Sequence, residues 1–364
     1  MKEEAALSAP VGPAARYRED PGMGHIHGGR KGTSQAWYSC ISRIDALFVS
    51  LYNKDDTHFQ RERQRMNFEP FYHILKESQI RLNEPMSRHT TFGIGGPADI
   101  FLMPSSVEEL QQVCRLVREM ALPFFIVGGG ANLLVRDKGI RGAVIFTGRM
   151  QSLQAEGCHL RAASGVSTAR AARLAMESGL SGMEFAAGIP GTIGGAAFMN
   201  AGAYGGEMGK IVSAVTTCDS EGSMHRYSRE ELTYRYRHSR FMDSPEIITE
   251  VELLLTPGDP DQILEKMNDY NGRRHEKQPL ESRSAGSTFK RPEGHFVGAM
   301  LEEAGLKGYA VGDAEVSRKH AGFLINRGRA TCADMLALIS DIQEKVKERY
   351  GVTLEPEVQI VGEK

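Results

Sequence analysis

From residue 68 onward, the spacing of apolar residues predicts a regular succession of helices and strands. Leu110 and Val113 recur at helical spacing behind Ser106, which is predicted to form a capping box with Glu109. By the same reasoning, helices are predicted at about 70–79, 106–120, 167–178, 261–277 and 332–350, and strands at 98–103, 124–127, 143–146, 211–219, 246–255 and 353–360. This order predicts an α+β protein with a separable C-terminal α/β unit.

The first 65 residues differ from the rest of the chain. They contain Pro10, Pro13 and Pro21, a Gly/His patch over 24–29 and no sustained periodicity, so we expect disorder or only local order there. Two histidines in a glycine-rich tail are usually solvated, and no metal site is expected. The sequence FQRERQR, whose codons can be purine-rich like a bacterial ribosome-binding site, comes just before Met66. We therefore hypothesise that Met66 is the native start.

Composition and charge narrow the class of protein. The chain has 364 residues, of which 41% are hydrophobic, and a formal net charge of −2. This is typical of a soluble enzyme of two or three domains, and it gives no electrostatic attraction to nucleic acid. No apolar run is long enough to span a bilayer, and the five cysteines form no CxxC pair. We therefore expect a cytoplasmic protein without disulfide framework, zinc site, membrane contact or implied protein partner.

The most informative segment runs from Gly188 to Gly209 and contains eight glycines and no Lys or Arg. Glycine leaves the backbone uncovered and tolerates left-handed dihedral angles, so a flat or phosphorylated ligand can lie against main-chain N–H and C=O groups. A flexible linker is the alternative interpretation. It is disfavoured because linkers are rich in Ser and polar residues, whereas Ile193, Phe198 and Tyr204 are suited to packing.

A second glycine-rich segment, Gly128 to Asn132, follows a predicted buried strand. Its three consecutive glycines allow successive N–H groups to converge on a pyrophosphate as an anion nest. The segment lacks the GxGxxG pattern of a Rossmann fold, and the chain contains no Walker pattern GxxxxGK[ST]. Two interpretations stay open for this segment: a phosphate-bearing cofactor held by backbone, and a purely structural tight turn.

Taken together, several motifs strongly resemble the UDP-N-acetylenolpyruvoylglucosamine reductase family. They are TFGIGG at 91–96, GGGANLL at 128–134, AGIPGTIGG at 187–195, NAGAYG at 200–205, YRHS at 236–239, GSTFK at 286–290 and LEPEV at 354–358. The resemblance covers about residues 68–362 in the family's order. It implies a vanillyl-alcohol-oxidase/PCMH-type FAD-binding domain of two subdomains and a C-terminal α/β substrate-binding domain, in the subtype that lacks the tyrosine loop.

The resemblance also implies a domain division and a reaction. The implied division is an extension at 1–65, a lead-in helix and turn at 66–93, an FAD-binding domain at 94–259 with subdomains 94–147 and 148–259, and a substrate-binding domain at 260–364. The implied reaction is the NADPH-dependent, FAD-mediated reduction of UDP-N-acetylglucosamine enolpyruvate to UDP-N-acetylmuramate in peptidoglycan precursor synthesis. FAD would be bound non-covalently, and the small-molecule partners would be NADPH and the UDP-sugar.

Site residues carry over from the resemblance position by position. The implied catalytic residues are Arg237, Ser287 and Glu357. The implied cofactor-binding residues are Gly128, Gly129, Gly130, Ala131, Asn132, Leu133, Gly188, Ile189, Pro190, Gly191, Gly194 and Gly195. The implied substrate-binding residues are Tyr204, Tyr236, Lys290 and Arg291. Arg291 departs from family members in which Asn follows the Lys, so substrate contacts can differ there.

The chemistry of an enol ether explains why these residue types are needed. An enol ether is electron-rich and accepts hydride poorly, so the negative charge on its conjugated carboxylate must be stabilised. Arg237 can supply a positive fork, a protonated Glu357 can add a hydrogen bond, and Ser287 is the candidate proton donor. Two alternatives stay open. One is an oxidase of the same fold that tethers flavin through His or Cys, residues absent from 128–135; the other is a non-catalytic nucleotide sensor.

Overall fold

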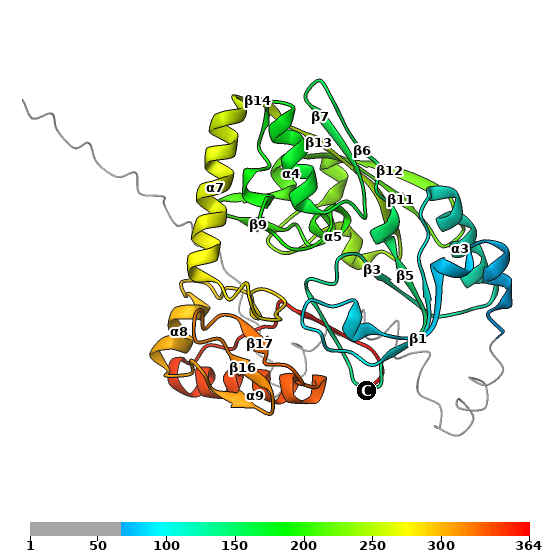
Figure 1. The fold of residues 1–364 in the computed structure, drawn as a ribbon. Helices are drawn as coiled ribbons and strands as arrows, with labels where there is room; N and C mark the ends of the chain where they lie inside the picture. Colours follow the sequence, from blue (N-terminus) through cyan, green and yellow to red (C-terminus); the bar gives the residue numbers. More distant parts are fainter. Residues whose placement is uncertain (1–66) are drawn as a thin grey trace, which may run out of the picture. The chain divides into compact units, whose positions relative to one another are not determined.

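The computed structural model describes residues 67–364, so the predictions for residues 1–66, including the start at Met66, lie outside the described residues. Four strands lie in the first part of the described chain: β1 (Ile80–Pro85), β2 (Pro97–Leu102), β3 (Phe124–Val127) and β5 (Ile140–Phe146). They form one sheet in the order β1-β2-β5-β3 (Figure 1). Strand β5 runs parallel to both β2 and β3, and helix α3 (Val107–Glu119) connects β2 to β3.

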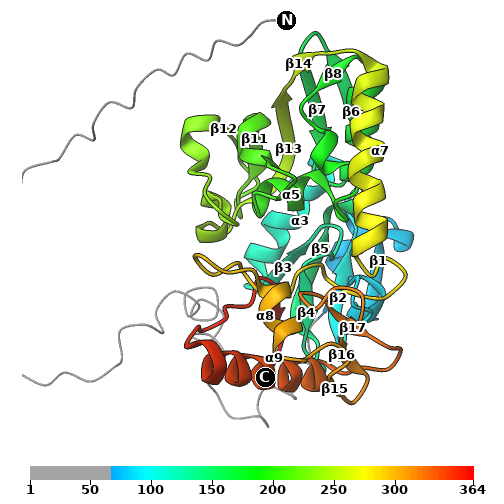
Figure 2. The ribbon, with the colours of Figure 1, turned by 90° about the vertical axis from the view of Figure 1, so that its left-hand side faces the viewer.

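A five-stranded antiparallel sheet follows. Its strands are β6 (Leu153–Glu156), β7 (His159–Ala163), β11 (Val212–Cys218), β12 (Met224–Ser228) and β13 (Ile247–Leu254), in the order β12-β11-β13-β7-β6. Between β7 and β11 lie α4 (Thr168–Glu177), α5 (Ile193–Phe198), α6 (Met208–Ile211), β8 (Leu180–Ser181), β9 (Gly202–Ala203) and β10 (Gly206–Glu207). Strand β14 (Thr256–Pro257) leads into α7 (Pro260–Lys277), which packs against α4 (Figure 1) and lies beside β8 (Figure 2).

The C-terminal part combines two helices with a small antiparallel sheet. Its elements are α8 (Val297–Glu303), β15 (Ala310–Val311), β16 (Ala314–Val316), β17 (Leu324–Asn326) and α9 (Cys332–Tyr350). The chain then returns to the first part, where β18 (Gln359–Val361) pairs in parallel with β4 (Leu133–Val135). Because β4 directly follows the first glycine-rich segment, this pairing brings C-terminal residues to that segment.

Three groups of buried apolar residues hold the described part together. The largest contains residues of both large sheets and of α7, among them Val215 and Met267. A smaller group on the first sheet includes Phe101. The third belongs mainly to the C-terminal part but also includes Phe92 and Leu134 from the N-terminal half. Separating the C-terminal part would therefore expose apolar surface on both sides, which opposes separation.

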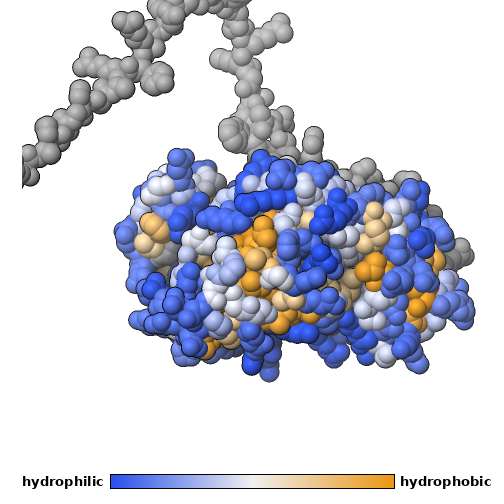
Figure 3. Space-filling view, turned by 90° about the horizontal axis from the view of Figure 1, so that it is seen from above, coloured by the Kyte–Doolittle hydropathy of each residue, from blue (hydrophilic) through white to orange (hydrophobic). Residues whose placement is uncertain are grey.

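The surface seen from the end that carries α7 and β14 is mostly hydrophilic, with apolar residues gathered near the middle of that face (Figure 3). Within residues 67–364, no helix is long and apolar enough to cross a membrane. In the same residues, no group of three or more His, Cys, Asp and Glu side chains is placed to hold a metal ion.

Most predicted elements are confirmed. Strand β3 has the predicted bounds, and α4, α7 and α9 begin and end within two residues of the predicted positions. Gly351, at φ +69°, ends α9 in the left-handed conformation. At α3, the Ser106 hydroxyl accepts the Glu109 N–H at 3.2 Å as predicted, but the Glu109 carboxylate accepts the Ser105 N–H at 2.7 Å. The predicted capping box is therefore wrong in its second half.

Two predicted elements are wrong in kind or length. Residues 70–79 form two 3-10 turns, η1 (Glu69–His73) and η2 (Glu77–Gln79), instead of a helix. A continuous helix is excluded at Lys76, whose backbone is extended (ψ 151°). The Gln79 Nε2 donates to the Met103 carbonyl at 3.0 Å. The strand predicted at 353–360 shrinks to β18, because Pro356 has no N–H to donate to a strand ladder.

Asn326, at the end of β17, generates a prediction about stability. It is 5% exposed; its Nδ2 donates to the Phe92 carbonyl at 2.9 Å, and its Oδ1 accepts the N–H groups of Gly328 and Ala330 at 2.8 and 3.0 Å. Asn326→Ala leaves these groups without that partner and should lower the free energy of unfolding by about 2–4 kcal/mol. Chemical denaturation measures this, with the exposed Asn268→Ala on α7 as control. A loss no larger than that of the control would contradict the prediction.

Candidate active site

The two glycine-rich segments meet in space. Gly128 to Asn132 follows β3, and Gly191 and Thr192 lead into α5. A Cβ on Gly129 would lie 2.6 Å from the Gly191 Cα, and one on Gly128 would lie 2.6 Å from the Thr192 Oγ1. A side chain at either position would force the segments apart, so their contact requires glycine.

The backbone at this contact is available to a ligand. Gly129 and Gly195 are exposed, and among the described residues no backbone hydrogen bond uses the N–H groups of Gly129, Gly130 or Ala131. Gly130, at φ +61°, lies so close to the chain that a Cβ would be 1.9 Å from the His89 carbonyl oxygen. Consecutive unused N–H groups in such a turn form an anion nest. The segment thus offers the donors that a cofactor diphosphate needs.

Two side chains hold the second segment from behind, around residues 188–191. The Thr168 hydroxyl donates to the Ile189 carbonyl, and the Arg274 guanidinium of α7 donates to the Gly188 carbonyl at 2.7 Å. Arg274 is 6% exposed, and burial lowers its pKa, although interaction with Tyr204 acts in the opposite direction. Sequence reasoning missed Arg274, because an arginine within a helix carries no motif of its own.

The remaining predicted cofactor residues divide between surface and core. Pro190 is exposed, whereas Asn132 and Ile189 are half-buried. Leu133 is 8% exposed and packs in the core of the first sheet, and Gly194 is buried where a Cβ would lie 2.6 Å from the Ser164 Cβ. Leu133 and Gly194 therefore support the loops by packing.

Arg237 and Glu357, 120 positions apart in the chain, form an ion pair. The Arg237 Nε lies 2.6 Å from the Glu357 Oε1, and the two side chains are 22% and 13% exposed. Burial raises the pKa of Glu357, although the positive charges of Arg237 and Lys290 act in the opposite direction. A carboxyl group in this setting can serve as a charged acceptor or as a neutral donor, depending on what else lies beside the guanidinium.

A tight turn presents Arg237 to Glu357. Arg237 has a φ of +52°, and reciprocal backbone hydrogen bonds between Arg235 and His238 close the turn. The Ser239 hydroxyl donates to the last carbonyl of α5 at 2.6 Å, and the Asn200 Nδ2 donates to the Arg235 carbonyl at 3.0 Å. The Ser of the YRHS motif therefore fastens the turn to α5, and the left-handed residue stands at its tip.

Ser287 lies beside the ion pair. The Glu357 N–H donates to the Thr288 carbonyl at 2.8 Å, and the Asn132 Nδ2 donates to the Glu357 carbonyl at 3.0 Å. Ser287 is exposed, and its hydroxyl donates to the Phe289 carbonyl at 3.3 Å. The structure thus gathers the three predicted catalytic residues at the end of the first glycine-rich segment.

Three of the four predicted substrate-binding residues lie near the Arg237–Glu357 ion pair. The Tyr236 hydroxyl accepts the Arg291 N–H at 3.4 Å, and the Arg237 guanidinium stands 5.1 Å from the centre of the Tyr236 ring. Lys290 forms an ion pair with Glu355 at 2.6 Å. The Tyr236 ring therefore contacts both the Arg237 guanidinium and the backbone of Arg291, whose own guanidinium stands 4.5 Å from the centre of the Phe296 ring.

The fourth predicted substrate-binding residue, Tyr204, is held separately. It has a φ of +51°, and its ring stacks on that of Tyr270 with the centroids 4.5 Å apart. The Arg274 guanidinium lies 5.4 Å from the centre of the Tyr204 ring. Helix α7 therefore fixes this tyrosine, a relation that the sequence pattern did not predict.

Backbone donors on two touching glycine-rich segments, without a Rossmann or Walker pattern, suit a phosphate-bearing cofactor, and the adjoining Arg–Glu pair and Ser suit an anionic substrate. Comparison with known families identifies the class as an FAD-dependent oxidoreductase. Residues 98–228 match the FAD binding domain family, and residues 278–361 match the C-terminal domain of UDP-N-acetylenolpyruvoylglucosamine reductase.

Whole-chain relatives make the assignment specific. The chain is 48% identical over 291 residues to the UDP-N-acetylenolpyruvoylglucosamine reductase of Caldanaerobacter subterraneus, covering 80% of this chain and 96% of that protein. It is 47% identical over 290 residues to that of Clostridium novyi, covering 80% and 94%. The crystal structure of the Thermus caldophilus reductase superposes with a TM-score of 0.66 at 35% identity, covering 77% of this chain and 97% of that one.

The chain therefore belongs to the UDP-N-acetylenolpyruvoylglucosamine reductase family. The predicted fold class, an FAD-binding domain followed by the family's C-terminal domain, is confirmed.

Gly130 offers a test of the glycine contact. Gly130→Ala would place a methyl group against the His89 carbonyl and displace the loop. The FAD retained per chain should fall by at least about tenfold, because a loss of about 1.4 kcal/mol in binding free energy lowers the affinity tenfold. The ratio of flavin to protein absorbance after purification measures this. Gly157→Ala is the control, since it shares a positive φ of +56° but has no heavy atom within 4 Å. Equal FAD contents in the two variants would show that the contact is not needed.

Proposed function

We propose that this protein reduces UDP-N-acetylglucosamine enolpyruvate to UDP-N-acetylmuramate, a step of peptidoglycan precursor synthesis, with NADPH as reductant. Membership of the reductase family supports this proposal. The observation that carries the mechanism is the Arg237–Glu357 pair beside Ser287. Bound FAD supplies hydride transfer from NADPH to the sugar nucleotide, and the chain's own residues bind, orient and protonate the substrate.

Arg237 and Glu357 are assigned to the carboxylate of the substrate. Negative charge accumulates there as hydride arrives, and a guanidinium that is already in place stabilises it without reorganisation. The Arg237 Nη2 makes only a long hydrogen bond, 3.4 Å, to the Gly202 carbonyl. The guanidinium can therefore donate to a second anion. Glu357, whose pKa is raised by burial, then donates a hydrogen bond in its protonated form.

Ser287 is assigned to the final proton transfer. The carbon that bears the carboxylate needs a proton once hydride has been added, and the exposed Ser287 hydroxyl makes only a long bond, 3.3 Å, to the Phe289 carbonyl. A substrate atom can replace that bond. Serine is a weak acid, so its proton is given as negative charge develops on the substrate and is resupplied through solvent.

The nucleotide end of the substrate is assigned to the exposed residues around Tyr236. Tyr236 is 55% exposed, and its hydroxyl accepts the backbone N–H of Arg291 in the segment that also carries Lys290. The Arg291 guanidinium lies over the Phe296 ring, and the Lys290 ammonium pairs with Glu355. Cations of this kind suit a diphosphate, and an exposed ring suits a base. Tyr204, which is 38% exposed, completes the proposed contacts of the diphosphate and uridine parts.

Further parts of the proposal concern organisation and location. We assign the chain to the subtype without the tyrosine loop, because only β15 to β17 and short connections separate α8 from α9. The sequence placed the boundary between the FAD-binding domain (94–259) and the substrate-binding domain (260–364) before α7. We move this boundary to residue 278, because Ile263 and Met267 of α7 are buried with residues of the five-stranded sheet. The cytoplasm, which supplies NADPH and UDP-sugars, is the proposed compartment.

The proton-transfer role predicts separable half-reactions. Ser287→Ala should leave the reduction of flavin by NADPH unchanged but slow flavin reoxidation by the enolpyruvyl sugar nucleotide by about 10²-fold or more, because a positioned proton donor contributes that much. Stopped-flow absorbance of the flavin separates the two steps. Ser284→Ala, in the same segment, is the matched control. Equal loss in both half-reactions would assign Ser287 a structural or shared binding role instead.

The role of Glu357 predicts a pH dependence. Its raised pKa means that the protonated, donating form persists above the range of an ordinary glutamic acid and is lost as pH rises through the folded-state pKa. Flavin reoxidation by substrate should therefore slow with rising pH in this window, and Glu357→Gln, which keeps a donor at every pH, should lack this limb. Rate measurements across pH test this. An unchanged profile in the Gln variant would rule Glu357 out as the titrating group.

A further inference from the structure

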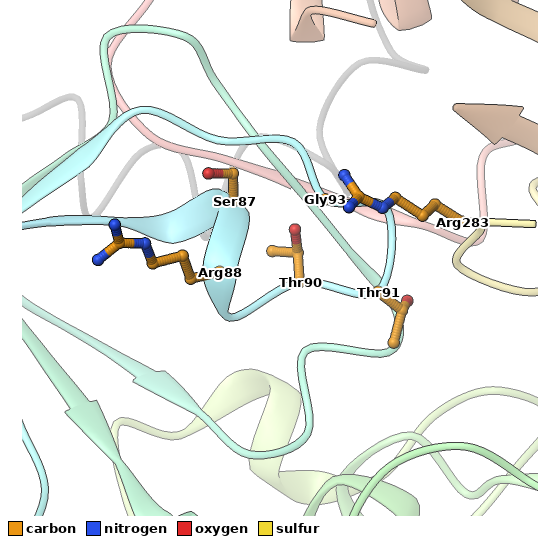
Figure 4. A pocket seen from close by; sticks show the side chains of 6 residues that line it. All are labelled: Ser87, Arg88, Thr90, Thr91, Gly93 and Arg283. Carbon is orange, nitrogen blue, oxygen red and sulfur yellow. The ribbon is translucent and has the colours of Figure 1, made fainter. Parts of the chain in front are cut away.

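A cavity of about 460 Å³ lies between the turn at residues 90–93 and the segment that carries Arg283 (Figure 4). It is lined by Ser87, Arg88, Thr90, Thr91, Gly93 and Arg283. Apart from the glycine, every lining residue bears a hydroxyl or a guanidinium group, and none bears a carboxylate. This lining is chemically suited to an anion.

Arg283 is the main charge of this cavity. Its side chain reaches Gly93, where a Cβ would meet the Arg283 Cδ and Nη1 at 2.9 Å. Among residues 67–364, neither a hydrogen bond nor an ion pair engages its guanidinium. Arg88 lies on the other side of the turn, where its guanidinium is directed away from Arg283 and contacts Glu84 at 3.7 Å, so it adds little charge beside Arg283 (Figure 4).

The turn contributes an unused hydroxyl to the same cavity. The Thr90 hydroxyl donates to the Ile94 carbonyl at 2.8 Å, whereas the Thr91 Oγ1 is buried and has no hydrogen-bond partner among the described residues. A buried hydroxyl without a partner is unfavourable by about 1–3 kcal/mol. The Thr91 hydroxyl is directed away from Ser87 and Thr90 (Figure 4), so a ligand oxygen in the cavity would remove that cost once the Thr91 side chain turns toward it.

Backbone ties fix the two walls of the cavity. The Asn326 N–H donates to the Arg283 carbonyl at 2.9 Å, and the Asn326 side chain donates to a carbonyl of the turn at 2.9 Å. The Thr91 N–H donates to the Gly130 carbonyl at 3.1 Å, so the turn also adjoins the anion nest. Arg283 precedes Ser287 by four residues, a separation of at most about 14 Å. The cavity therefore lies within reach of a dinucleotide bound beside Ser287.

We propose that this cavity, the Arg283 pocket, binds a phosphate group of a nucleotide held at the adjoining site. Arginine matches phosphate oxygens with paired N–H donors, and Ser and Thr hydroxyls can bond the remaining oxygens. The inference rests on the proposed function, which supplies two sources of phosphate, the 2′-phosphate of NADPH and the diphosphate of FAD. The 2′-phosphate is favoured because the nest at 128–131 already offers donors to a diphosphate.

Three variants of the FAD-loaded protein test the Arg283 pocket. Arg283→Gln removes the charge, Arg283→Lys keeps it without the fork, and Arg173→Gln, a 75% exposed arginine on α4, is the control for loss of one charge. Calorimetry measures the affinity for adenosine 2′-monophosphate and for adenosine. Steady-state kinetics give the ratio of kcat/KM for NADPH to that for NADH, and absorbance gives the FAD retained after dialysis.

The expected result is specific to phosphate. Arg283→Gln should weaken adenosine 2′-monophosphate binding about tenfold and lower the NADPH-to-NADH ratio of kcat/KM about tenfold, without changing the affinity for adenosine. The values for Arg283→Lys should lie between those of Arg283→Gln and the wild type. The values for Arg173→Gln should match the wild type. Loss of FAD with an unchanged ratio would identify the FAD diphosphate as the source. Values within twofold of wild type for all three readouts, in a variant with wild-type melting temperature, would overturn the proposal.

The same data separate this inference from the proposed function. If the wild type binds adenosine 2′-monophosphate more tightly than adenosine but does not reduce the enolpyruvyl sugar nucleotide, the reaction is wrong and the pocket stands. If the wild type reduces that substrate but Arg283→Gln keeps full phosphate discrimination and FAD, the reaction stands and the pocket is wrong.

Discussion

The site depends on the short parallel pairing of β4 with β18. Strand β4 starts directly after Asn132, and β18 starts two residues after Glu357, so the register Leu133 to Gln359 sets these two residues side by side. With the Glu357 backbone fixed there, its N–H reaches Thr288 and its carboxylate reaches Arg237. A slip of one residue in β18 would turn its side chains to opposite faces and separate the Arg–Glu pair.

Close backbone approach is the second constraint. The two glycine-rich segments touch where Gly129 meets Gly191, at a distance that no Cβ would allow. The same approach that excludes side chains leaves main-chain donors uncovered, so packing and ligand binding make the same demand on the sequence. Buried side chains from other elements, Thr168 and Arg274, hold the outer segment in place. The binding surface is therefore rigid because of what lies behind it.

The sequence was sufficient for features that are local or periodic. Helices with an apolar face, such as α9, and glycine runs that need positive φ, such as that at Gly130, can be recognised from a few neighbouring residues. Contacts between distant segments could not be recognised in this way. Arg274 and Asn326 stand in ordinary surroundings in the sequence, and their partners are 86 and 234 positions away. At Pro356 the local pattern predicted too much: the apolar residues around it indicated a strand at 353–360, but proline has no N–H to donate, and the strand is limited to β18.

The Arg237–Glu357 pair has a consequence for proton balance. In the structure one guanidinium faces one carboxylate; a substrate carboxylate would bring a second anion to the same buried cation. Two negative charges at short range favour protonation of one of them. Glu357 is the group that we expect to take up the proton, because burial already raises its pKa. Binding of the substrate and uptake of a proton from solvent then become a single linked equilibrium.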